Sequence, residues 1–142
     1  MISFQNKKLV EDVNFLELSK WLEQIIKREK KVAGDIVCVF CDDKYLLEKN
    51  IKYLNHNYFT DVITFNYCED RTISGDILIS VDRVKENAKH YRVSFFSEIK
   101  RVIVHGLLHL LGYDDKTSSS KQEMTKKEDF YLNLYDDFRR SI

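Results

Sequence analysis

The sequence predicts an α+β fold, with one domain over residues 1–142 and a mixed four-stranded sheet packed with about five helices. The length of 142 residues suits one domain with one core. Short β-branched runs alternate with longer segments whose apolar residues recur at helical spacing. The chain has no Pro and only four Gly, so no segment is typical of a flexible linker.

The first strand and the first helix are predicted near the N-terminus. Ile2 and Phe4 are apolar at alternate positions, which indicates a short strand. Asn14 is the expected N-cap of an amphipathic helix over residues 15–30, whose apolar residues recur every three or four positions. We expect Gly34 to break this helix.

The run Ile36–Phe40 predicts the second strand, and Asp42 is the expected cap of a short helix after it. Cys38 and Cys41 form a CxxC pair, for which a redox or zinc role is the alternative interpretation. Cys38 lies within the strand run, and the chain has no second CxxC to complete a zinc site. We therefore interpret the pair as buried structural thiols.

Two neighbouring strands are predicted in the middle of the chain. The β-formers of Asp61–Tyr67 indicate one strand and Gly75–Val81 the next, with a turn around Glu69–Ser74 between them. A helix is predicted over Asp82–Tyr91. The two strands are therefore expected to pair with each other.

Two further helices complete the predicted order. Ser94 is the expected cap of a long apolar helix through Leu111, which Gly112 ends. Ser120 and Glu123 form a predicted capping box for the last helix. The expected apolar stripe of that helix consists of Met124, Tyr131, Leu134, Tyr135 and Phe138. The order is thus strand, helix, strand, helix, two strands and three helices.

Charge and hydropathy bear on the expected binding partners and on the expected cellular location. The formal net charge is zero, which removes the simplest argument for a nucleic-acid binder without excluding one. Residues 81–101 hold six Arg or Lys against three acids, which fits a local basic face or a merely solvated helix. The N-terminus lacks a signal-peptide pattern, and the run Val102–Leu111 is too short for a membrane span, so we expect a cytoplasmic protein with no membrane association.

The most informative pattern lies on the predicted central helix. His105 and His109 are four residues apart and therefore share one helix face, where two imidazoles can bind one metal ion. Gly112 can reverse the chain, so that Asp115 returns towards the histidines. The metzincin zinc proteases use the same spacing for three ligands and a turn glycine. The pattern predicts a metal site on the central helix with three ligands and an open position.

Two departures from the metzincin pattern change the interpretation. Gly106 stands where the general base Glu of a protease would be, which disfavours a peptidase. Asp115 replaces a His; a carboxylate is an acceptable zinc ligand, and iron or manganese becomes more favourable than with three His. Asp114 is the alternative third ligand. The competing interpretation is two core histidines satisfied by backbone or carboxylate partners.

At these residues the chain resembles the YbeY family, whose signature runs HGxLHLxGYDH. Residues 105–114 match this signature, and Gly75-Asp76-Ile77 matches the LGDI strand of the family. Asn50, Tyr53, Thr60, Asp61, Val62 and Phe65 fit its NxxYRxxDxPTDVLSF segment. The resemblance spans about residues 50–115.

The resemblance implies a small zinc-dependent α+β protein that cleaves single-stranded RNA and acts in 16S rRNA 3′-end maturation and ribosome quality control. It implies one Zn²⁺ per chain, or another divalent transition metal, and as partners single-stranded 16S rRNA and the ribosome or small-subunit proteins. The third family His is Asp115 here, and the family Arg falls on Leu54. Two further family positions, Asp and Pro, are Asn57 and Phe59. Either phosphate binding then uses another cation, Arg101, Arg92 or Lys116, or catalysis is weakened.

The expected catalytic residues are therefore His105, His109 and Asp115, acting through metal-bound water. Thr60, Asp61 and Arg101 are candidate substrate-binding residues, although Thr60 and Asp61 also suit a simple turn before a strand. Two other functions stay open: a metal-dependent hydrolase of another substrate, and a ribosome-assembly binding factor in which the metal is structural.

Overall fold

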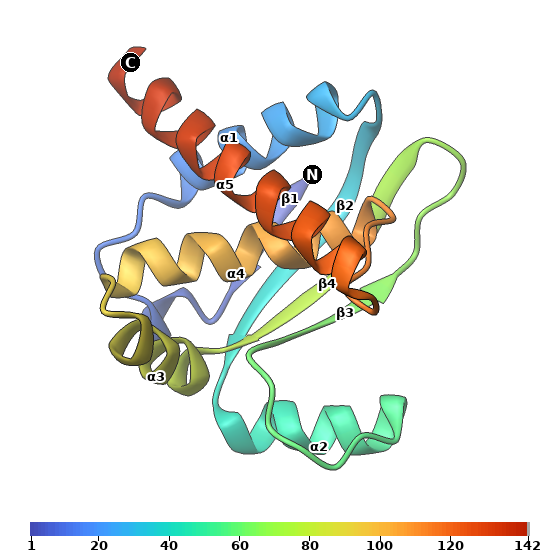
Figure 1. Ribbon diagram of the computed structural model, residues 1–142, viewed down its shortest axis with the longest axis vertical. Helices are drawn as coiled ribbons and strands as arrows, with labels where there is room; N and C mark the ends of the chain where they lie inside the picture. The colour runs from blue at the N-terminus through green and yellow to red at the C-terminus, as the bar shows by residue number, and fades with distance from the viewer. Residues whose placement is uncertain (142) are drawn as a thin grey trace.

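The computed structural model describes residues 1–141, apart from the side chains of residues 138, 140 and 141 (Figure 1). The strands are β1 (Ile2–Gln5), β2 (Val32–Cys41), β3 (Val62–Asn66) and β4 (Thr72–Ser80). The helices are α1 (Phe15–Arg28), α2 (Asp43–Leu54), α3 (Val81–Tyr91), α4 (Phe95–Leu110) and α5 (Ser118–Ser141), with a 3-10 turn at Lys7–Leu9. This order confirms the predicted α+β fold; the side chain of Phe138, expected on the last apolar stripe, lies outside the described part.

The four strands form one mixed sheet in the order β1-β2-β4-β3. β2 pairs in parallel with both β1 and β4, whereas β3 pairs antiparallel with β4. The expected pairing of the two middle strands is therefore confirmed, and their hairpin places β3 at one edge of the sheet.

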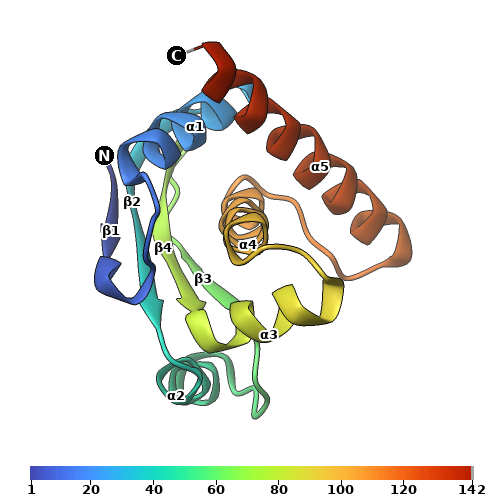
Figure 2. The same ribbon diagram turned by 90° about the vertical axis from the view of Figure 1, so that its left-hand side faces the viewer.

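The helices form unequal layers on the two faces of the sheet. α1 and α4 pack directly on one face, α3 packs beside α4, and α5 lies outermost over α1 and α4 (Figure 2). α2 packs from the other face on β3 and β4. Among the described residues, no helix combines the length and the apolar character that crossing a bilayer requires.

The main core lies between the sheet and α1, α4 and α5. Alternate strand residues, including Ile36, Cys38 and Ile77, are fully buried against the helices. The indole Trp21 is also fully buried and donates a hydrogen bond to the backbone oxygen of Tyr131 at 2.8 Å, which ties α1 to α5. A smaller apolar cluster on the opposite sheet face consists of Cys41, Leu46, Ile63 and Leu78.

The two cysteines of the CxxC pair belong to different clusters. Cys38 lies in the main core and Cys41 in the smaller cluster, so the two thiols lie on opposite faces of β2. Burial raises the pKa of both thiols to about 12, and nearby acidic residues add to the shift at Cys41. Both are free thiols, which agrees with a structural role.

Gly34 does not end the first helix, and that prediction is wrong. α1 ends at Arg28, and Lys30 takes a left-handed backbone conformation with φ 62°. Strand β2 begins at once, because Val32 pairs with Thr72 of β4, and Gly34 lies inside that strand. A side chain at 34 would meet the Ser74 hydroxyl at 2.2 Å, so the glycine serves the close approach of two strands.

Two other boundaries also differ from the predictions. The last helix begins at Ser118, because the Thr117 hydroxyl accepts the backbone N–H of Ser120 at 3.0 Å. Ser120 therefore lies in the first turn and is not the cap. Strand β4 begins at Thr72 instead of Gly75, because the turn after β3 is tighter than predicted and closes between Glu69 and Thr72.

The central helix α4 approaches the sheet closely at Gly106. A Cβ atom at this position would lie 2.7 Å from Cγ2 of Ile77 on β4. The glycine therefore lets the helix backbone rest on the sheet and fixes the depth of its neighbours in the core. His105 lies on the adjoining, partly exposed face of the same helix.

Candidate metal centre

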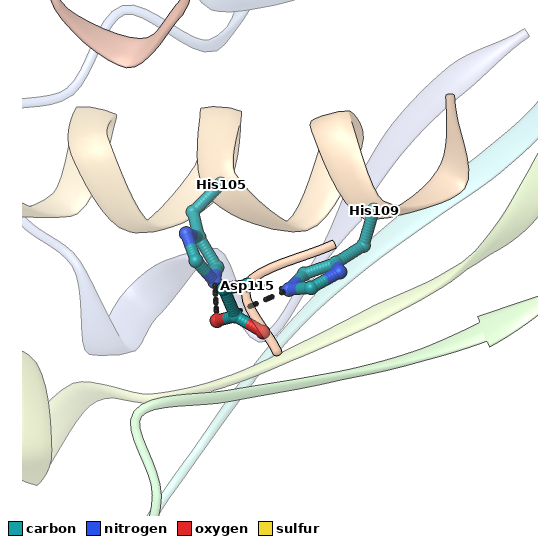
Figure 3. A group of neighbouring side chains, drawn as sticks. All are labelled: His105, His109 and Asp115. Atoms are coloured by element: carbon teal, nitrogen blue, oxygen red, sulfur yellow. Dashed lines mark hydrogen bonds and ion pairs between the residues drawn. The ribbon is translucent and has the colours of Figure 1, made fainter. Parts of the chain in front are cut away.

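Helix α4 presents its two histidines on one face near its C-terminal end. The rings of His105 and His109 lie with their centroids 4.6 Å apart, and their Nε2 atoms are 3.0 Å apart (Figure 3). The Ser94 hydroxyl caps the first turn, as predicted, and the apolar face of the helix is buried in the core. The register of the helix therefore directs both rings out of the core towards the same point.

The chain reverses after α4 and brings a carboxylate to the two rings. Gly112 has φ +104°, a conformation that strongly favours glycine. Asp115 Oδ2 then lies 3.5 Å from Nε2 of His105 and 3.8 Å from Nε2 of His109. The neighbouring Asp114 is exposed and accepts the backbone N–H of Lys116 at 3.1 Å. Asp115, and not Asp114, faces the histidines.

These three residues could hold a metal ion. Their ligand atoms all lie within 4.8 Å of one another. A tetrahedral zinc site with bonds of about 2.0–2.1 Å has ligand-to-ligand distances of roughly 3.3 Å, and the distances of 3.0, 3.5 and 3.8 Å lie close to this value. Two imidazoles and a carboxylate suit zinc and other divalent transition metals. The side chains are 24, 28 and 43 % exposed, so one side of the cluster stays accessible.

A buried carboxylate on α5 holds His105 from behind. Glu128 is 7 % exposed, and its Oε2 lies 2.7 Å from Nδ1 of His105. An ionised carboxylate only accepts hydrogen bonds, so Nδ1 carries the proton and Nε2 faces Asp115 and His109. Arg101 donates to the other oxygen of Glu128 at 2.9 Å and to Asp129 at 2.8 Å.

Sequence reasoning missed Glu128, although the sequence carries a signal for it. The residue lies four positions after Met124 and three before Tyr131, both of which are buried on the apolar stripe of α5. An acidic residue on an apolar stripe needs a buried partner. That partner is the His105–Arg101 pair, 23 and 27 residues away in the chain.

The surroundings move the pKa values of the two imidazoles in opposite directions. Burial acts to lower the pKa of His105, but the hydrogen bond and charge of Glu128, with the charges of Asp115 and Asp61, outweigh burial and raise it. Burial and the charge of His105 lower the pKa of His109. The His105 imidazole is thus the more basic of the two.

Two cavities meet at the cluster. The larger, of about 900 Å³, lies between α3, α4 and α5 and is lined in part by Asn87, Glu98, Arg101 and Glu128. The smaller, of about 340 Å³, lies between the α2–β3 loop and β3. Asp61, His105 and Asp115 line both cavities, whereas His109 lines the smaller one. The candidate metal centre therefore lies where the two cavities join.

The three candidate substrate-binding residues also line these cavities. Thr60 borders the smaller cavity, and its hydroxyl donates a long hydrogen bond to the backbone oxygen of Val62 at 3.4 Å. Asp61 accepts a hydrogen bond from Asn87 at 3.1 Å, and burial raises its pKa despite the opposing charge of His105. Arg101 borders the larger cavity, but its guanidinium is bound to two carboxylates. In this geometry Arg101 joins α4 to α5 through these two ion pairs.

An α+β domain whose central helix directs two imidazoles at a nearby carboxylate, with access from two cavities, has a group of side chains that could hold a metal ion with one side open. Comparison with known proteins assigns the family. Residues 2–136 match the family described as Endoribonuclease YbeY. The chain therefore belongs to the YbeY endoribonuclease family.

Individual relatives cover nearly the whole chain. A protein of Karelsulcia muelleri named Endoribonuclease YbeY is 45% identical over 132 residues, which are 93% of this chain and 94% of that protein. A Flavobacterium johnsoniae protein of the same name is 45% identical over 95% of this chain and 97% of its own. The solution structure of a Thermotoga maritima protein is 29% identical, with a TM-score of 0.66 over 99% of this chain and 93% of that one.

Proposed function

We propose that this protein is a metal-dependent endoribonuclease that cleaves single-stranded RNA and acts in the cytoplasm in 16S rRNA 3′-end maturation and ribosome quality control. One observation carries the proposal: His105, His109 and Asp115 converge where two cavities join, in a chain that belongs to an endoribonuclease family. The expected partners are single-stranded 16S rRNA and the ribosome or its small-subunit proteins.

The chemistry is divided between the ion and the side chains around it. A bound Zn²⁺, or another divalent transition metal, supplies positive charge that polarises a phosphoryl oxygen and makes water more acidic. His105 and His109 hold it as neutral ligands and Asp115 as the third, while Glu128 keeps Nε2 of His105 directed inwards. If water attacks, the product keeps a 5′-phosphate; if the RNA 2′-hydroxyl attacks, a cyclic phosphate results.

The two cavities fit an extended strand better than a compact ligand. They are lined by different elements, α3 to α5 in one case and the α2–β3 loop in the other, and they share three lining residues, so a single strand could extend past the ligand cluster from one cavity into the other. Thr60 and Asp61 line this path and can hydrogen-bond to sugar hydroxyls.

A ribosome-assembly factor with a structural metal is the second candidate function. Leu54 lines the smaller cavity and offers no charge for a phosphate, and Arg101 is bound to Glu128 and Asp129. Without a free arginine at either position, we expect weaker phosphate binding next to the metal. A metal-dependent hydrolase of another substrate is the third possibility and is separated from the first by the same experiment.

The test combines metal content with RNA cleavage on the same samples. Metal is measured by mass spectrometry on the wild type, His109→Ala and Asp115→Ala, and cleavage is measured on a single-stranded RNA and its duplex. Asp114→Asn is the matched control, because that carboxylate is exposed and turned away from the cluster. We expect metal and single-strand cleavage to be lost together in the two ligand variants and kept in the control.

Other outcomes select the other functions. A wild type that binds no metal after reconstitution would exclude the proposed centre. Stoichiometric metal without RNA cleavage, with retained binding to ribosomal particles after metal removal, would favour the assembly factor. Metal with hydrolysis of a different ester would favour the third possibility.

A further inference from the structure

Two aromatic rings lie together on the exposed loop between α2 and β3. The rings of His56 and Tyr58 stack with centroids 5.2 Å apart and an interplanar angle of 18°, and the Tyr58 hydroxyl lies 3.0 Å from Nδ1 of His56. Tyr58 is 56 % exposed and His56 is exposed as well. Neither ring is buried in the hydrophobic core, so the pair exposes aromatic surface to solvent.

A buried amide holds this loop in one conformation. Asn50 is 1 % exposed, and its side chain donates to the backbone oxygen of Tyr58 at 2.9 Å. The backbone oxygen of Asn50 accepts the N–H of His56 at 3.1 Å, and Asn55 ends α2 in a left-handed conformation. The aromatic pair is therefore fixed before any ligand arrives, which reduces the entropy cost of binding.

The aromatic pair borders the cavity that contains all three candidate metal ligands. His56 and Tyr58 line the 340 Å³ cavity together with His105, His109 and Asp115. Ligand pockets begin at about 300 Å³, so this cavity suits one small planar group with its substituent. The adjacent Phe59 packs against the guanidinium of Arg83 at 5.5 Å and is absent from the cavity lining.

We propose that this cavity is a subsite for one unpaired nucleobase next to the cleaved phosphodiester, with Tyr58 and His56 as its stacking surface. Unpaired bases stack on aromatic side chains, and stacking tolerates every base because each has a π-face. The paired bases of a duplex are already stacked on their neighbours, so the subsite selects single strands. The inference rests on the proposed RNA-cleaving function and adds the group that recognises the substrate.

Binding and cleavage are measured separately on the full chain. Short single-stranded RNAs that each carry one 2-aminopurine, at a different position in each strand, are bound to metal-free protein, and an unlabelled strand is cleaved by metal-loaded protein. We expect Tyr58→Ala to weaken binding at least about five-fold and to abolish the quenching of 2-aminopurine. Tyr58→Phe keeps the ring and should bind and quench as the wild type does. His56→Ala should lie between the two.

Tyr67→Ala is the matched control, since Tyr67 is also an exposed tyrosine, at 58 %, but lines a different cavity with Tyr53 and Asp76. Metal content is measured on every variant and should stay at the wild-type level. If Tyr58→Ala binds RNA and quenches 2-aminopurine as strongly as the wild type, and the wild type cleaves RNA, the proposed subsite is wrong and the proposed function stands. Loss of metal or of folded structure in Tyr58→Ala would also overturn it. A wild type that neither binds nor cleaves RNA would remove both.

Discussion

The residue that most shapes the candidate centre without belonging to it is Glu128. It is buried between His105 and Arg101, and its two oxygens are shared between these partners. Carboxylates in this position fix the ring orientation and tautomer of a ligating His, and their loss costs about 10–100-fold in metal affinity. Glu128→Gln places an amide donor or a weaker acceptor against Nδ1 of His105. We expect its zinc affinity to fall by about that factor in a competition titration with a chromophoric chelator.

Asp129→Asn is the control for this change. It weakens the exposed ion pair of Arg101 and leaves the contact between Glu128 and His105 in place. Surface ion pairs contribute little, so zinc affinity should stay within about two-fold of the wild type. Equal losses in both variants would mean that the whole α4–α5 contact, and not Glu128 alone, supports the centre.

At the residue scale, the ligand cluster could be predicted from spacing and Glu128 could not. The helical period puts His105 beside His109, and a glycine turn returns Asp115, so all three belong to one short segment of chain. Glu128 reaches His105 only because α5 folds back over α4. Arg101 was predicted as a cation for substrate, and its two carboxylate partners come from that same distant helix.

At the scale of elements, α4 and β4 depend on the missing side chain of Gly106. An Ala at 106 would bring Cβ within 2.7 Å of Ile77 Cγ2, and overpacking of this kind costs about 1–3 kcal/mol. Ala has a higher helix propensity than Gly, which stabilises the folded state by roughly 1 kcal/mol and offsets part of this cost. We expect Gly106→Ala to lower the free energy of unfolding by about 1 kcal/mol net in urea titrations.

The Ile77→Ala background tests the cause of this loss. Removing the contacting methyl group should make the cost of Gly106→Ala smaller than it is in the wild type, which appears as a coupling energy in a double-mutant cycle. The same cost in both backgrounds would assign the effect to something other than the α4–β4 contact.

The contact between α1 and α5 is expected to weaken in acid. Burial acts to raise the pKa of Glu29, but hydrogen bonds from Tyr113, Tyr131 and Lys127 outweigh it and lower the pKa below its ordinary 4.5. A lowered folded-state pKa stabilises the protein above the ordinary value, and this stability is lost as pH falls through the folded-state pKa. Glu29→Gln should therefore cost about 1–3 kcal/mol near neutral pH.

The difference between wild type and Glu29→Gln should shrink as the pH falls below 4.5. Urea unfolding followed by fluorescence of the buried Trp21 gives the free energies at each pH. Glu23→Gln on the exposed side of α1 is the control and should be nearly neutral throughout. A difference for Glu29→Gln that stays constant down to about pH 3 would rule out its ionised form as the source of stability.

Element types were predictable because they follow local periodicity, whereas one boundary depended on a distant strand and another on the choice between two nearby caps. Glycine is a typical helix breaker, yet Gly34 lies within a strand, where the Ser74 hydroxyl of the neighbouring strand leaves no room for a side chain. Ser120 and Glu123 have the spacing of a capping box, but Thr117 supplies the cap three residues earlier. A sequence window cannot rank two such caps, because the better one is chosen by where the preceding loop ends.

At the scale of the whole molecule, the position of β4 could not be predicted. Pairing of the two middle strands follows from their short turn, but β4 also pairs in parallel with β2, which lies more than 30 residues earlier in the chain. This insertion makes β4 an inner strand, and α4 packs over β4 and its neighbour β3. It therefore places Asp61, the residue before β3, in the same cavity lining as His105 and His109.

The candidate ligands come together only in the folded chain, so metal binding should stabilise the whole fold. These ligands come from α4 and from the segment that leads into α5, and α5 covers α1 and α4 as the outermost layer (Figure 2). An ion that binds only the folded state at 100 times its Kd adds about 2.7 kcal/mol. For a domain of this size, that corresponds to a rise in Tm of about 8–12 °C.

Circular dichroism melts at a series of free zinc concentrations measure this effect, and the rise should follow the logarithm of concentration above Kd. His109→Ala and Asp115→Asn should melt independently of zinc, because each removes one of the ligands. Asp114→Asn should respond as the wild type does, since its carboxylate faces the turn. Zinc-independent melting of the wild type, or an equal rise in the ligand variants, would show that the three side chains do not bind the ion together. The melts require no RNA, so they test the centre separately from the reaction proposed for it.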